Sequence, residues 1–217
     1  IIAPWIVALI TVPGLFELFR QAPAGSVIWS YLFGLLWGIG GLTFGMSMRY
    51  LGLSLGYAVA LGFCATFGTI MPPIYNGTFP ALFKNISGIV TLSGVPVCLI
   101  GIAVCSWAGL CKEKELSAEQ QKASITEFSL GKGILVAVFA GIMSACMAFG
   151  FAAGKPIAEL AVAKNVPPLF QNSAVLIVIL AGGFTTNFLW CVFLNFKNNT
   201  GKDYLNKHAS LVTNYIF

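Results

Sequence analysis

Charged residues are scarce in this sequence. Asp, Glu, Lys and Arg make up 9% of its 217 residues, whereas about a quarter of a soluble chain is usually charged. Hydrophobic residues make up 58%, and the few charges lie mostly between long apolar runs. This composition excludes an ordinary soluble domain and indicates a chain that crosses a membrane several times.

Histidine is almost absent, with a single residue at His208. A histidine-based zinc site is therefore excluded within this sequence, no phosphate-binding loop is present, and we expect neither an enzyme nor a cofactor. The formal net charge is +5, but the basic residues flank apolar runs and form no stripe of the kind that nucleic-acid-binding proteins carry. The expected partner is a lipid bilayer, not a nucleic acid.

Five runs contain no Asp, Glu, Lys, Arg or His: residues 27–48, 53–72, 89–110, 133–154 and 169–196. Each is long enough to span, because a helix of roughly 20 residues crosses a hydrocarbon core of about 30 Å. Continuous apolar runs favour helices over barrel strands, in which polar and apolar residues alternate. Together with residues 1–16, interpreted as the end of another span, they predict six transmembrane helices in an all-α bundle. Both ends of the sequence are apolar, and we expect it to be part of a longer protein.

The longest polar segment, residues 112–132, is the candidate linker between an N-terminal part (1–111) and a C-terminal part (133–217). Lys and Arg are distributed unevenly over the two sides of the predicted membrane, and the richer side is expected to be cytoplasmic. One side carries Arg20, Lys84, Lys155 and Lys164, and the other carries Arg49, Lys112, Lys114, Lys122, Lys132, Lys197, Lys202 and Lys207.

Small residues recur three or four positions apart in three of the runs. This spacing places each set on one helix face, where small side chains let helix backbones approach closely in lipid. We interpret most of these positions as helix-packing sites, and a minority as room for a moving helix or a solute. The sets are Gly34, Gly38, Gly41 and Gly45; Gly94, Cys98, Gly101, Cys105 and Ala108; and Ala137, Gly141, Ala145, Ala148 and Ala152.

Side-chain amides within the runs are candidate solute-binding groups. Gln171, Asn172 and Asn187 each have several donors and acceptors to satisfy. In lipid they are expected to face the protein interior or a wet cavity. The Ser and Thr side chains of the spans carry less information, because they can bond back to their own helix.

Two aromatic residues lie away from the ends of the predicted spans. Trp37 and Tyr57 could each present a flat ring with a polar edge to the apolar face of a sugar, or could pack against lipid or other helices. Trp5 and Trp29 lie nearer the expected span ends. We interpret them as belt aromatics at the membrane interface.

Lys155 ends an apolar run and precedes Pro156. Because proline disfavours helical geometry at the preceding residue, a helix break is predicted at Lys155. The lysine either extends toward the lipid headgroups or, as a cation at a broken helix end, lines a transport path.

Three blocks of the sequence resemble the L-rhamnose-proton symporter family: LLWGIG and FGMSMRYLGLSLG (35–40 and 44–56), GTIMPPIYNG (68–77), and GIMSACMAF with AGKP (141–149 and 153–156). The similarity extends through nearly the whole sequence. That family belongs to the drug/metabolite transporter superfamily, which implies ten helices in two inverted repeats of five. On this register the sequence holds the second to the seventh helix.

The resemblance implies a secondary transporter that takes up L-rhamnose or a related sugar across the bacterial inner membrane. The solute would bind near the midplane between the repeats, and uptake would be coupled to protons. No acidic residue lies inside a complete run, so Glu17 and Glu159, at span ends, are the candidate proton carriers here. The alternatives are a drug or metabolite exporter of the same superfamily and a non-transporting scaffold or sensor subunit.

Overall fold

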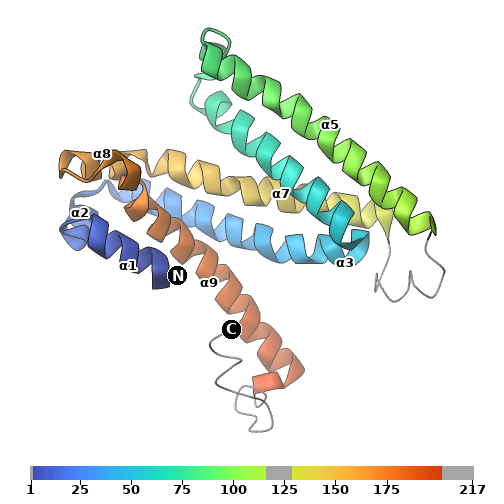
Figure 1. Cartoon of the computed structure of the whole chain (residues 1–217). Helices are drawn as coiled ribbons and strands as arrows, with labels where there is room; N and C mark the ends of the chain where they lie inside the picture. Colours follow the sequence, from blue (N-terminus) through green and yellow to red (C-terminus); the bar gives the residue numbers. More distant parts are fainter. Residues whose placement is uncertain (1, 116–128, 202–217) are drawn as a thin grey trace.

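The computed structural model of the protein describes residues 2–115 and 129–201, and these residues form helices joined by short turns (Figure 1). The predicted all-α fold is confirmed. The elements are α1 (Ile2–Thr11), α2 (Leu15–Gln21), α3 (Ala24–Tyr75), α4 (Phe79–Leu82), α5 (Ile86–Glu115), α7 (Leu130–Ala153), α8 (Lys155–Ala163), η1 (Pro168–Phe170) and α9 (Ser173–Asn198).

Four helical segments of the described chain are long and apolar enough to cross a membrane, namely α3, most of α5, most of α7, and η1 with α9. The α1–α2 pair makes a fifth if it is one span, although it bends by 88°. The prediction of one helix through residue 16 is therefore wrong. Pro13 and Gly14 explain the bend: proline breaks the hydrogen-bond ladder, and Gly14 takes a φ of +65°, which glycine adopts readily.

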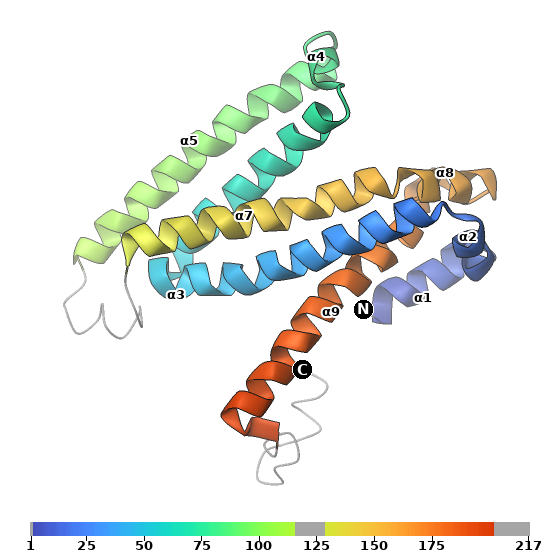
Figure 2. The same cartoon turned by 180° about the vertical axis from the view of Figure 1, so that it is seen from behind.

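Helix α3 has 52 residues, and its helical geometry is interrupted at Gly52 (φ 78°, ψ 169°). That conformation is open essentially only to glycine. The chain turns sharply there: the first half of α3 lies along α7, and the second half turns back beside α5 (Figures 1 and 2). The predicted separation of residues 27–48 from residues 53–72 is confirmed by this break.

The first half of α3 is the centre of the packing. It lies against α7 on one side and α9 on the other, and α9 in turn contacts α1 and α8. One buried cluster joins α2, α8 and α9 through Leu18, Ile157 and Val175. A second joins the second half of α3 to α7 through Leu55 and Ala137.

Glycines make the close approaches between these helices. A side chain at Gly34 would clash with the Ile179 carbonyl, and a Cβ at Gly38 would come within 2.9 Å of the Gly183 oxygen. The packing interpretation is therefore correct for these two positions. The structure shows no packing partner for the other predicted glycines of the first two stripes, because a Cβ at any of them would have no atom within 4 Å in the described part of the chain: Gly41, Gly45, Gly94 and Gly101.

The proposed linker, residues 112–132, falls mostly outside the described residues. Helix α5 continues to Glu115, and α7 begins at Leu130. Because α3 packs directly against α7 and α9, the parts before and after the linker are in extensive contact. The division into 1–111 and 133–217 remains a prediction.

Candidate functional site

The predicted helix break next to Lys155 is present. Helix α7 ends at Ala153, Gly154 connects the two helices, and Lys155 begins α8. The Lys155 Nζ lies 3.7 Å from the Glu159 Oε1, and these side chains are 76% and 66% exposed. A pair this exposed contributes little to stability. The assignment of these two residues to a transport site remains a prediction.

The other candidate proton carrier, Glu17, also has a basic neighbour. Its Oε1 lies 3.9 Å from the Lys164 Nζ and accepts a hydrogen bond of 3.0 Å from the Gln21 Nε2. Helices α2 and α8 contact each other at one end of the molecule (Figure 1). Both candidate carboxylates therefore belong to this end of the protein, and each is next to a lysine.

Gln171 and Asn172 lie in the connection between η1 and α9. Gln171 is half-buried and Asn172 is exposed. The Asn172 carbonyl accepts the backbone N–H of Leu176 at 2.9 Å, but its side chain does not cap α9. These two amides lie at the start of a helix, near the N-terminal end of the predicted run 169–196.

Trp37 and Asn187 meet the same glycine at the crossing of α3 and α9. A Cβ at Gly183 would come within 2.6 Å of the Trp37 ring, and the Asn187 Nδ2 donates a 2.8 Å hydrogen bond to the Gly183 carbonyl. These contacts favour helix packing for Trp37. They also give one donor of the Asn187 amide a partner on its own helix.

Tyr57 is separate from the other candidates. Its ring meets the Phe44 ring edge to face, with centroids 4.9 Å apart and an interplanar angle of 87°. Its side chain is 44% exposed. The structure therefore gives Tyr57 an aromatic neighbour across the Gly52 break, and brings it to none of the other candidate residues.

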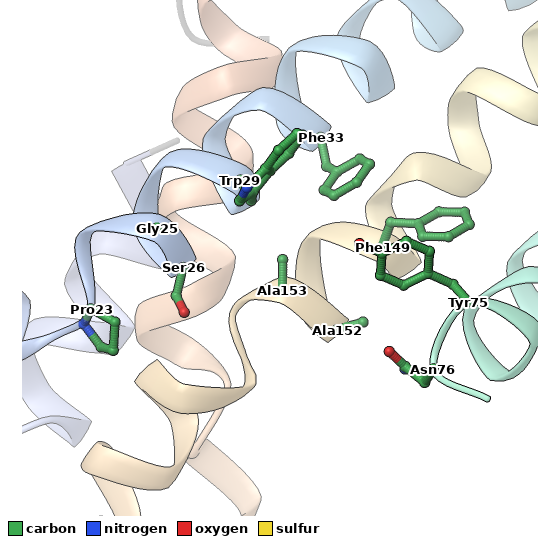
Figure 3. Close-up of a pocket in the computed structure, with 10 residues that line it drawn as sticks. All are labelled: Pro23, Gly25, Ser26, Trp29, Phe33, Tyr75, Asn76, Phe149, Ala152 and Ala153. Atoms are coloured by element: carbon green, nitrogen blue, oxygen red, sulfur yellow. The ribbon is translucent and has the colours of Figure 1, made fainter. Parts of the chain in front are cut away.

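A pocket of about 690 Å³ lies where the start of α3, the end of α3 and the end of α7 meet. We refer to it as the aromatic pocket (Figure 3). It contains none of the predicted site residues. Its lining consists of Pro23, Gly25, Ser26, Trp29, Phe33, Tyr75, Asn76, Phe149, Ala152 and Ala153.

Aromatic rings form one wall of the aromatic pocket. The Phe33 ring stacks on the Phe149 ring, with centroids 5.5 Å apart and an interplanar angle of 24°. The centroid of the Trp29 ring lies 5.8 Å from that of Phe33. Polar groups come from Ser26 and Asn76, and no lining residue is charged. A concave apolar site with a few polar groups is the usual form of a small-molecule site.

The sequence alone did not identify this pocket, because its residues come from three separate segments. Trp29 was interpreted as a belt aromatic from its place near a span end. One signal was available: the blocks 68–77, 141–149 and 153–156, which carry the family resemblance, contain Tyr75, Asn76, Phe149 and Ala153.

The described residues offer no metal site, since no three His, Cys, Asp or Glu side chains are grouped to hold an ion. All six cysteines are free thiols. Several span hydroxyls bond to their own helix as expected: Thr43 to Ile39 and Ser47 to Phe44.

Comparison with known proteins gives a consistent result. A family model described as L-rhamnose-proton symport protein (RhaT) matches residues 1–217. The chain is 38% identical over 191 residues to the L-rhamnose-proton symporter of Cronobacter sakazakii, covering 88% of this chain and 54% of that protein. It is 36% identical to the Yersinia pestis protein of the same name, covering 100% of this chain and 63% of that protein.

The chain therefore spans about 54–63% of the length of these two relatives. No solved structure matches it. The all-helical fold, the several apolar helices and the full-length family match identify a multi-pass membrane protein. This chain belongs to the L-rhamnose-proton symport protein family.

Proposed function

We propose that this protein serves in the proton-coupled uptake of L-rhamnose, or a closely related sugar, across the bacterial inner membrane. The observation that carries this proposal is the family match along all 217 residues, together with relatives that are named L-rhamnose-proton symporters. The apolar helices support it, because a secondary transporter is built from such spans.

In this proposal the chain contributes six spans. The two halves of α3, separated at Gly52, each count as one, and the bent α1–α2 pair counts as another. Transporter folds contain broken and bent helices where the backbone lines a cavity. The bend at Gly14 is a feature of this kind, whereas Gly52 and Gly154 each end a span.

The proton would be carried on a carboxylate at the end where α2 and α8 meet. Glu17 and Glu159 are the candidates, each with a lysine within 4 Å. A neighbouring cation makes the charge of a carboxylate sensitive to any solute that displaces it. Binding of the sugar and of the proton would then depend on each other.

Uptake by whole cells tests the function. The full-length protein is expressed in bacteria that lack their own L-rhamnose transporter, and uptake of labelled L-rhamnose is measured with and without a proton ionophore. We expect uptake above that of cells with empty vector, and its loss when the proton gradient collapses. Absence of uptake by protein that is demonstrably in the membrane contradicts the proposal, and ionophore-resistant uptake contradicts the coupling.

A further inference from the structure

We propose that the aromatic pocket is an outward-facing binding site for a 6-deoxy sugar of the L-rhamnose type. This inference rests on the proposed function and adds a location to it. None of the sequence-based candidate residues lies in this pocket.

The aromatic wall matches the apolar surface of such a sugar. A 6-deoxyhexose has a methyl group in place of a hydroxymethyl group, and its ring presents C–H bonds on a flat face. The stacked rings of Phe33 and Phe149, with Trp29 beside them, offer flat apolar surfaces. Aromatic rings bury large apolar areas against such partners.

The polar side of the pocket matches the hydroxyls. In the described residues, the Ser26 hydroxyl and the side-chain amide of Asn76 make no hydrogen bond within the protein, and both residues line the pocket. Together they can donate to and accept from sugar hydroxyls. Because no lining residue is charged, a neutral polyol suits the pocket better than an ion. Its volume of about 690 Å³ admits a monosaccharide with bridging waters.

The position of the pocket relative to the basic residues indicates that it opens outward. Its lining segments adjoin Arg20 near the end of α2, Lys84 in the turn between α4 and α5, and Lys155 at the start of α8. These residues belong to the side of the predicted membrane with fewer Lys and Arg, which is expected to face away from the cytoplasm. A solute arriving from outside would meet this pocket first.

The pocket is lined by both halves of α3, whose relative motion is expected in a transporter. Trp29 and Phe33 precede the break at Gly52, whereas Tyr75 and Asn76 follow it at the far end of α3. A change in the angle between the two halves of α3 would therefore widen or narrow the pocket. Hinge motion of this type is a common way to alternate access to a site.

Sugar binding by variants of the full-length protein tests the site. In lipid nanodiscs, Trp29→Ala and Asn76→Ala should each bind L-rhamnose about 10-fold more weakly than the parent, or worse, since they remove an apolar wall and a hydrogen-bonding group. The matched control is Trp107→Ala, because Trp107 is 71% exposed on α5 and lies outside the pocket. This control should bind like the parent.

Two further measurements test the ligand class and the side of access. L-Mannose, which carries a hydroxyl on the carbon that is a methyl group in L-rhamnose, should bind roughly 10- to 100-fold more weakly. Asn76→Cys should gain labelling by an impermeant maleimide added outside cells, relative to the parent with its natural cysteines, and L-rhamnose should slow that labelling.

The outcomes separate this inference from the proposed function. If the parent transports L-rhamnose but both pocket variants bind it normally and labelling of Asn76→Cys is unprotected, the pocket is a lipid or helix-packing surface and the inference is wrong. If the parent transports no L-rhamnose, the proposed function itself fails. Trp29 is 56% exposed, so its replacement should fold; if it does not, Asn76→Ala, at an exposed turn, carries the test.

Discussion

At the scale of single residues, Lys155 and Glu159 form an exposed ion pair beside a helix interruption. Lys155 begins α8 directly after the interruption, Glu159 lies one turn further along, and both side chains remain mostly exposed while 3.7 Å apart. An exposed pair adds little to folding stability. A measurable role in transport would therefore reflect contact with a proton or a solute and not a loss of fold.

We predict that Lys155→Met in the full-length protein reaches the membrane at the parent level but takes up L-rhamnose more slowly. Methionine keeps an apolar stem of similar length and removes the charge beside Glu159. Coupling between two sites commonly amounts to a 5- to 150-fold effect, so we expect a loss of at least about 5-fold and a changed dependence of uptake on external pH. Labelled uptake at several pH values measures both.

The matched control for this variant is Lys84→Met. Lys84 is exposed, and is expected on the same side of the membrane, in the turn between α4 and α5. Its replacement should leave uptake and pH dependence unchanged. Parent-like uptake by Lys155→Met at matched expression would remove Lys155 from the candidate site and leave it as a lysine at the headgroups.

For single residues, the sequence predicted the features that depend on neighbouring residues and not those that depend on distant segments. The break beside Lys155 was predictable to within one residue, because Pro156 cannot continue a helix from the preceding turn; the interruption itself lies at Gly154. The role of Trp29 was not predictable, since a tryptophan near a span end carries the same local signal whether it meets lipid or Phe33. Only the return of Tyr75 and Asn76 to the same place makes a pocket, and this depends on the turn at Gly52.

At the scale of helices, the glycine stripe of α3 contains positions of two kinds. Gly38 touches the backbone of α9, while a Cβ at Gly41 would meet no atom within 4 Å in the described chain. Both positions fit the same spacing in the sequence. The periodicity therefore predicts a small-residue face correctly but cannot tell which part of it has a partner.

We predict that Gly38→Leu destabilises the protein whereas Gly41→Leu does so much less. A side chain at Gly38 must displace Gly183 and Thr186 of α9, and overpacking of this kind typically costs roughly 1–3 kcal/mol. Thermal melting in detergent and the yield of folded protein measure the difference. Equal melting of the two variants would show that α3 and α9 do not approach each other as the structure has them.

The bend between α1 and α2 shows a different limit of sequence reasoning. Residues 1–16 form a continuous apolar run, and hydrophobicity alone extends a helix through it. Pro13 and Gly14 were the local signal for the 88° bend. Polarity indicates which residues avoid water, whereas proline and a left-handed glycine determine where the helix ends.

At the scale of the whole molecule, three connections between the spans are expected together on one side, and the aromatic pocket adjoins all three. They carry Arg20, Lys84, and Lys155 with Lys164. Orientation therefore decides whether that pocket meets solute from outside or from the cytoplasm. The uneven distribution of Lys and Arg predicts the first arrangement. Labelling from each side of the membrane tests this orientation.

We predict that single cysteine labels at Ser87 and Ser117 of the full-length protein react from opposite sides of the membrane. Helix α5 runs from Ile86 to Glu115, 30 residues, which is about 45 Å at 1.5 Å per residue. This exceeds a hydrocarbon core of about 30 Å, so Ser87 at its start and Ser117 just past its end should lie on different sides.

Ser87→Cys should react with an impermeant maleimide added to intact cells, and Ser117→Cys, in the 112–132 segment, only after the cells are opened. The parent with its natural cysteines provides the background. The reverse pattern would turn the aromatic pocket toward the cytoplasm, and reaction of both from one side would mean that α5 does not cross the membrane.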